Sequence, residues 1–297
     1  MNLKDILLDT SETLIEAVGM TFLLIAAAID LSIGSMVVFA AVVSAEVMGR
    51  LGGTSAQVAE SVFPHLAVAV VAGISLGVVS GLLWGTVNAI LAVKLRIPPF
   101  ITTLASAGVI LGLAEVWTGG INVETVPLQL QYSFGLGELA GVIPWMVLVA
   151  AVIAGLAWVV LARTSFGMRT YAIGASREAA RRAGINVERH LMKVFMLMGA
   201  LAGIVGVIDA ARFGTAAVSG HTTDALNAIA AVVIGGTSLF GGRGRISGTI
   251  VGSLIPSVLT NGFIIVGVQP FWQPVAVGCV LLLAVYLDQV RRRSGAS

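Results

Sequence analysis

Unbroken apolar runs of roughly twenty residues recur along the whole chain, and a helix needs a run of about that length to cross the hydrocarbon core of a bilayer. Charged residues make up only 11% of the 297 positions, whereas a soluble protein has about 25%. Because a bilayer offers no water to backbone amides, the spans must be helices or a closed barrel, and a barrel would show short segments of alternating polarity. The sequence therefore predicts one transmembrane domain, residues 1–297, folded as an all-α polytopic bundle.

We expect about nine membrane spans. An odd number of crossings places the two termini on opposite sides of the membrane. The expected segments cover residues 13–29, 35–49, 65–93, 99–117, 141–162, 191–209, 226–240, 247–266 and 272–287.

The basic residues predict the orientation, because cytoplasmic loops carry an excess of Lys and Arg. The loop 163–193 alone holds seven of the 17 basic residues. If this loop is cytoplasmic, alternation brings the C-terminus and seven more basic residues inside and leaves Lys4, Arg50 and Arg212 outside. The N-terminus then lies outside, so either a preceding helix is missing from this sequence or residues 1–12 lie along the interface. The other inside residues are Lys94, Arg96, Arg243, Arg245, Arg291, Arg292 and Arg293, and acidic residues expected outside are Glu60, Glu115, Glu124, Glu138 and Asp224.

Several other classes of protein lack the residues they would need. The formal charge of +2 comes from basic residues in short loops, which set topology and give no nucleic-acid surface. His65, His190 and His221 are far apart and have no Cys or carboxylate at ligand spacing, so no metal site is expected. The glycine-rich stretch 235–245 lacks the Lys followed by Ser or Thr of a phosphate-binding loop. We therefore expect no enzyme activity and no cofactor bound by this chain, and we interpret the single cysteine, Cys279, as a packing residue.

Four glycines at every fourth position predict a close helix contact, since this spacing puts them on one face of a helix. They are Gly73, Gly77, Gly81 and Gly85.

A faint internal repeat predicts an inverted topology. The stretch 81–98 passes from a glycine through Asn88 to a proline, and the stretch 252–270 passes from a glycine through Asn261 to a proline. By the charge distribution the two stretches cross the membrane in opposite directions, which is typical of inverted-repeat transporters.

Polar groups inside apolar segments are costly, so each needs a partner or a water-lined path. Asp30 follows an apolar run, and the stretch Ser32–Ser35 after it can interrupt a helix. Two interpretations stay open: a broken helix that lines a pathway, or a carboxylate that caps the helix starting near Ser32. We expect no charged constellation at depth that could bind sodium or relay protons. The candidate pathway residues are Asp30, Ser32, Ser35, Asn88, Thr102, Thr103, Asn227, Thr237 and Asn261.

The basic loop is expected to contain a short helix at about residues 176–184. Ser176 can cap its N-terminus, Glu178 favours the positive end of the helix and can pair with Arg182, and Gly184 suits a left-handed stop. A helix this short is marginal in water, so the bundle or a second protein must hold it; the alternative is an ordinary positive-inside loop. The candidate docking residues are Gly174, Ser176, Arg177, Glu178, Ala179, Ala180, Arg181, Ala183 and Gly184, and Arg182 also projects from the helix.

At four stretches the sequence resembles the transmembrane permease subunits of bacterial ABC sugar importers, in the branch that carries ribose, xylose, arabinose and galactosides. The first two are Asp30–Ser35 (DLSIGS) and Asn88 followed by Ile97–Leu104 (IPPFITTL). The others are Gly174 with residues 178–185 of the basic loop, and the glycines of 235–244. The four stretches occur in the order seen in the family and span nearly the whole chain.

The resemblance implies ten helices per subunit, the architecture of type II ABC importers, and alternating access in the inner membrane. It implies three kinds of partner: a second permease subunit, identical or related; cytoplasmic ATPase subunits that use ATP and Mg and sit on the helix around Glu178; and a periplasmic or lipid-anchored sugar-binding protein. A branched-chain amino acid permease remains an alternative with the same architecture. An ion-coupled secondary transporter would be expected to carry an ion site at depth, and a membrane enzyme would need a nucleophile with its base or a metal cluster.

Overall fold

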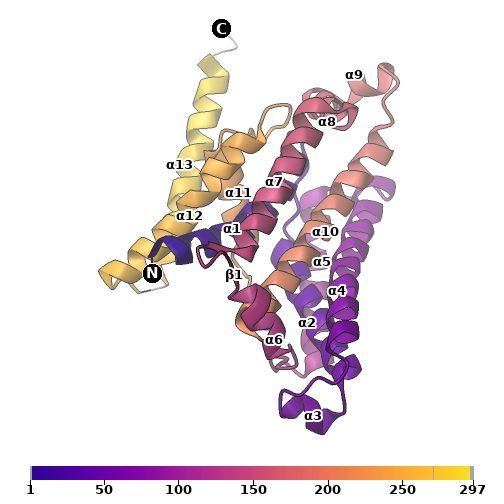
Figure 1. Ribbon diagram of the computed structural model, residues 1–297. Coiled ribbons are helices and arrows are strands. Elements are labelled where there is room, and N and C mark those ends of the chain that lie inside the picture. Colours follow the sequence, from indigo (N-terminus) through magenta and orange to yellow (C-terminus); the bar gives the residue numbers. More distant parts are fainter. Residues whose placement is uncertain (1, 270, 295–297) are drawn as a thin grey trace. The chain divides into compact units, whose positions relative to one another are not determined.

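The computed structural model describes residues 2–269 and 271–294 (Figure 1). Most of this part of the chain is helical, and the strands named within it form one antiparallel pair, β1 (Glu138–Leu139) with β2 (Ile143–Pro144). Helices satisfy their backbone hydrogen bonds internally, which a bilayer requires. The architecture agrees with the expected all-α membrane bundle.

Six of the described helices are long and apolar enough to cross a membrane, judged by length and composition. Three further helices overlap the remaining expected segments: α1 (Asn2–Ile25), α11 (Asp224–Ile234) and α13 (Trp272–Ser294). Each of the nine apolar segments therefore coincides at least in part with a helix. The six are α2 (Ile33–Gly52), α4 (Leu66–Ala89) with its π-helical extension η1 (Ile90–Lys94), α5 (Pro99–Thr118), α7 (Trp145–Arg163), α10 (Val187–Phe213) and α12 (Ile246–Val266).

Short helices fill several connections. They are α3 (Ser55–Ala59), α6 (Leu128–Leu130) continuing into η2 (Gln131–Gly135), α8 (Ser165–Ala175) and α9 (Arg177–Arg182).

One helix is shorter than its apolar pattern indicates. The sequence favours a segment over 226–240, but α11 ends at Ile234. Gly236 follows with φ +90°, a left-handed conformation that an α-helix cannot contain and that glycine adopts at little cost. The apolar segment expected over 226–240 continues past Ile234, although the helix does not.

The chain forms two compact units. Unit 1 comprises residues 1–29, 150–191 and 223–297, and unit 2 comprises residues 30–149 and 192–222. Helices α7 and α10 each contribute to both units.

In unit 1, α1, α11 and α12 pack against one another through small residues. A Cβ added at Gly252 would lie 1.9 Å from the carbonyl oxygen of Ala231, so α12 approaches the backbone of α11 as closely as glycine permits. Between α1 and α12, the hydroxyls of Thr21 and Thr249 are 2.6 Å apart.

In unit 2, α4 packs on α2 and α10 through the glycines spaced four residues apart. A Cβ at Gly81 would lie 2.3 Å from the carbonyl oxygen of Gly199 in α10, and one at Gly73 would lie 2.5 Å from Met48 in α2. Gly77 faces both helices and Gly85 faces α10 at similarly short distances. The face that these glycines share is therefore used for close helix packing.

Candidate coupling, pathway and pocket sites

Helix α9 has the local signals of a complete short helix. The Ser176 hydroxyl accepts a hydrogen bond from the backbone N–H of Ala179 at 3.2 Å, which satisfies one of the free donors at the helix start. At the other end, Gly184 has φ +79°, and the N–H of Ile185 donates to the carbonyl of Ala180 at 3.0 Å. The helix covers Arg177–Arg182, within the expected 176–184.

The surface of α9 is almost entirely open. Ala180 is buried at 3% exposure, whereas Ala179 and Ala183 are exposed, so the three alanines do not form one covered face. Glu178 and Arg182 form an exposed i,i+4 ion pair. Arg181 lies 3.9 Å from Glu188 at the start of α10, also at the surface. The exposed charges leave α9 free to meet a second protein.

Beneath α9, three segments distant in sequence meet through their backbones; we call this the α9 junction. The Arg177 guanidinium donates to the carbonyl of Ala27 at 3.0 Å, and the N–H of Gly242 donates to the carbonyl of Ile25 at 2.9 Å. A Cβ at Gly174 would lie 1.7 Å from the same Ile25 oxygen, a distance that no side chain allows. The end of α1, helix α8 and the 241–244 turn are therefore in direct contact.

A tyrosine side chain adds one more hydrogen bond to the α9 junction. The Tyr171 hydroxyl in α8 donates to the carbonyl of Gly244 at 2.7 Å. Partial burial raises the pKa of the Tyr171 phenol, so the donor stays protonated at neutral pH. The candidate pathway residue Thr237 belongs to this region: its hydroxyl is buried, and a Cβ at Gly244 would lie 2.6 Å from it. The structure thus puts Thr237 beside the α9 junction.

Four of the candidate pathway residues meet in unit 2, in what we call the Asp30 cluster. Asp30 is fully buried and accepts hydrogen bonds from the N–H and the hydroxyl of Ser32, at 2.8 and 2.6 Å. The Asn88 amide donates to the Ser32 hydroxyl at 2.8 Å and to the second oxygen of Asp30 at 3.3 Å. Thr103 accepts from the N–H of Leu31 at 3.0 Å. The cluster ties the start of α2 to α4 and α5.

Asp30 makes two kinds of contact, one within a local turn and one between helices. The carboxylate accepts the N–H of Ser32, the residue before α2, which forms a local Asx-type turn, and no side chain caps the first turn of α2. It also bonds to a helix 58 residues further on in the chain, which a simple cap would not require. The Asn88 side-chain oxygen is buried without a partner among the described residues, so the cluster retains an unused acceptor.

The other candidate pathway residues are dispersed. Ser35 is half-buried, and Thr102 is buried with no hydrogen-bond partner for its hydroxyl among the described residues, both in unit 2. Asn227 is half-buried in α11 and Asn261 is buried in α12, both in unit 1. The predicted set is thus divided between the two units.

One pair of ionisable side chains was not predicted from the sequence. His221 Nε2 lies 3.3 Å from a carboxylate oxygen of Asp209, a buried residue of the membrane-length helix α10. Asp209 was overlooked because it ends an apolar segment, and only tertiary folding brings His221 back to it. Among the described residues, no three His, Cys, Asp or Glu side chains are grouped to hold a metal ion.

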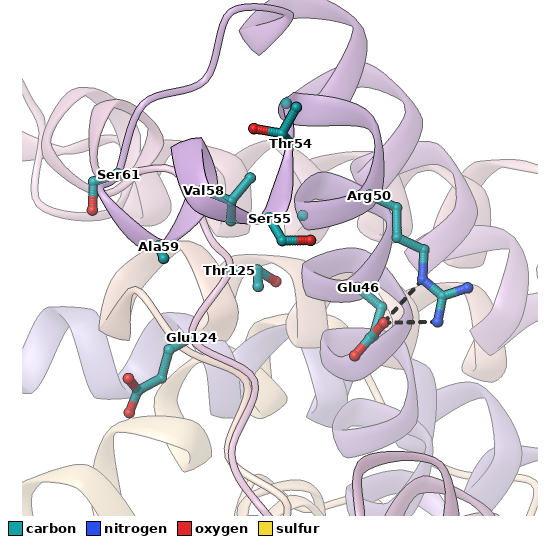
Figure 2. A pocket seen from close by; sticks show the side chains of 11 residues that line it. Glu46, Arg50, Thr54, Ser55, Val58, Ala59, Ser61, Glu124 and Thr125 are labelled. Atoms are coloured by element: carbon teal, nitrogen blue, oxygen red, sulfur yellow. Dashed lines mark hydrogen bonds and ion pairs between the residues drawn. The ribbon is translucent and has the colours of Figure 1, made fainter.

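Unit 2 also contains a polar pocket of about 940 Å³, shown in Figure 2. It is formed by the end of α2, by α3 with the residues around it, and by the extended segment at Glu124 and Thr125. None of these residues was predicted from the sequence to form a site. The lining residues are Glu46, Gly49, Arg50, Gly53, Thr54, Ser55, Val58, Ala59, Ser61, Glu124 and Thr125.

Membrane-length apolar helices, polar clusters inside them and one exposed basic helix define a multi-pass membrane protein of the permease class. The chain belongs to the family described as "Branched-chain amino acid transport system / permease component", whose model matches residues 2–285. This agrees with the resemblance drawn from the four sequence stretches.

The relatives include sugar permeases from several bacteria. The chain is 37% identical to the ribose import permease protein RbsC of Escherichia coli (strain K12), over 98% of this chain and 86% of the relative. It is 40% identical to RbsC of Bacillus subtilis (strain 168), over 97% and 85% of the two chains. It is 35% identical to the xylose transport system permease protein XylH of Haemophilus influenzae, over 98% and 90%. No solved structure matches the chain.

Proposed function

We propose that this chain is the transmembrane subunit of an ATP-driven ABC importer and forms the pathway by which a monosaccharide or related small sugar crosses the bacterial inner membrane. The relatives named for ribose and xylose transport support the substrate class. The observation that carries the mechanism is the α9 junction, because it gives an exposed basic helix a direct mechanical connection to the bundle.

The proposed topology has nine spans, with the basic loop 163–193 and the C-terminus in the cytoplasm. Contacts within each unit support it. In unit 1, the α9 junction joins the connections near residues 27, 174–177 and 242, all of which the charge distribution assigns to the inside. In unit 2, Thr125 donates to the carbonyl of Ala45, and Val123 pairs with Ala216, close to three connections assigned to the outside.

Coupling starts at α9. The ATPase subunits, which bind ATP and Mg, seat on the exposed face of α9, and the arginines there pair with acidic residues of the ATPase. A displacement of α9 is passed to the end of α1 by the hydrogen bond from Arg177 to Ala27. Asp30 follows Ala27 by three residues, so movement at the junction reaches the Asp30 cluster through the chain itself.

The pathway is lined by the candidate polar residues and opens alternately to the two sides of the membrane. Their amides and hydroxyls can replace water around sugar hydroxyls without a fixed charge. An inverted repeat relating 81–98 to 252–270 is part of this proposal. It is supported by the burial of Asn88 and Asn261 and by the close helix contacts at Gly81 and Gly252; Pro270 lies outside the described residues.

The assembly contains a second permease subunit, identical or related, and an extracytoplasmic sugar-binding protein that delivers the substrate. The test is reconstitution of the chain in proteoliposomes with its ATPase and binding protein. We expect uptake of a labelled pentose or hexose that requires ATP, and no ATP hydrolysis by the permease alone. Uptake of labelled leucine instead of sugar would favour the amino acid branch named in the family description. ATP hydrolysis by the purified permease would contradict the assignment of hydrolysis to a separate subunit.

A further inference from the structure

Hydrogen bonds between side chains and the backbone order the walls of the pocket in Figure 2. Thr54 caps α3 by accepting the N–H of Gln57, and the Gln57 side chain accepts the N–H of Thr54. The Thr125 hydroxyl donates to the carbonyl of Ala45 at 2.6 Å, which anchors the extended segment to α2. Gly49 brings the two even closer, since an added Cβ would lie 2.7 Å from Thr125.

The pocket has an excess of negative charge. On one wall, Arg50 lies 3.1 Å from Glu46 and neutralises it, as Figure 2 shows. Glu124 stands apart from this pair in the same view, is exposed, and forms no ion pair with any residue that the structure describes. One carboxylate of the pocket is therefore available for a cation from outside the chain.

The lining is polar and charged, which is unlike a small-molecule site and resembles the polar rim of a protein interface. Small-molecule pockets are mostly apolar and aromatic, with a few convergent polar groups. Here the lining consists of charged and hydroxyl side chains, glycines and small apolar residues, and no aromatic residue contributes. Arg50 is also 5.9 Å from the ring centroid of Trp117, outside the lining, so its position is fixed from two sides.

We propose that this pocket receives a basic side chain, Lys or Arg, of the soluble sugar-binding protein, and that Glu124 is its counter-ion. The inference rests on the proposed function, which assigns this end of unit 2 to the outside. The charge distribution supports the sign of the partner's charge, because Glu60, Glu115 and Glu138 are also expected at that surface. Opposite charges across an interface raise the association rate and fix the docking register.

The test measures binding of the system's sugar-binding protein to the permease–ATPase complex in nanodiscs. We expect Glu124→Gln to weaken binding several-fold and Glu124→Lys to weaken it about tenfold or more, with the salt dependence of the association rate reduced. Glu115→Lys is the matched control: it reverses an exposed carboxylate expected at the same surface but outside the pocket, so it should change only the long-range attraction and weaken binding much less than Glu124→Lys. Because Glu124 is exposed, neither variant should impair folding.

A second arm identifies the partner residue. Charge reversal of individual lysines and arginines on the binding protein should give one variant that restores binding to the Glu124→Lys permease. Unchanged affinity and salt dependence of Glu124→Lys, in a complex whose wild type imports sugar, would overturn the inference and leave the proposed function intact. Competition for the pocket by free sugar, abolished by Glu124→Gln, would also overturn it, whereas a wild-type complex that neither binds the protein nor imports sugar would remove the proposed function itself.

Discussion

The α9 junction and the Asp30 cluster stabilise polar groups in opposite ways. At the junction, charged side chains remain exposed, and the contacts that fix the segments are made largely by backbone carbonyls, backbone N–H groups and glycines. In the Asp30 cluster, a carboxylate is completely buried and its partners are mostly side chains. The junction should therefore be sensitive to added volume, and the cluster to the identity of its polar atoms.

The largest effect is expected from added volume at the junction. Gly174→Val puts carbon atoms where the carbonyl oxygen of Ile25 lies 1.7 Å from an ideal Cβ, so α8 must separate from α1. We expect loss of uptake and weaker binding of the ATPase, measured by transport and by co-purification. Gly155→Val in α7 is the control, because nothing lies within 4 Å of its Cβ position and Val costs a helix little relative to Gly.

The second-largest effect is expected from removing a polar group from the Asp30 cluster without adding volume. Asp30→Ala leaves the amide of Asn88 and the N–H and hydroxyl of Ser32 without their buried acceptor, which costs about 1–3 kcal/mol. We expect a lower unfolding temperature in detergent and uptake reduced at least tenfold. Asp30→Asn keeps an acceptor and should retain more of both, while Glu60→Ala, at an exposed position, should change neither. Equal stability of Asp30→Ala and wild type would show that the carboxylate does not support the cluster.

Variants on the exposed face of α9 should affect coupling to the ATPase without affecting the stability of the permease. The Glu178–Arg182 pair is solvent-exposed, so Glu178→Ala should leave the unfolding temperature nearly unchanged. If α9 seats the ATPase, the same variant should abolish uptake and loosen ATPase binding while membrane insertion persists. Gly184→Val, which strains a residue at φ +79°, should give the same pattern. Normal uptake by both variants would exclude α9 as the coupling element.

Local signals made α9 predictable, whereas contacts between segments distant in the sequence could not be predicted. Ser176, Glu178 and Gly184 specify the helix within nine consecutive residues, and its caps follow from those residues alone. The α9 junction depends on Ile25 meeting Gly242, and the Asp209–His221 pair on a turn after α10. The pattern of apolar and polar residues along the sequence does not indicate such contacts. The polar pocket of unit 2 was not predicted for the same reason, since its three walls come from α2, α3 and a segment some 60 residues later.

The smallest effect is expected from removing one hydrogen bond of the junction without changing its shape. Tyr171→Phe deletes the bond to the Gly244 carbonyl, worth about 1 kcal/mol net, and should lower uptake a few-fold. Because burial raises the pKa of the Tyr171 phenol above its ordinary value, its contribution to stability is fully present below pH 10 and lost as pH rises beyond that. The ratio of wild-type to Tyr171→Phe uptake should therefore stay constant between pH 6 and 9. A ratio that changes in this range would mean that the hydroxyl does more than hold the 241–244 turn against α8.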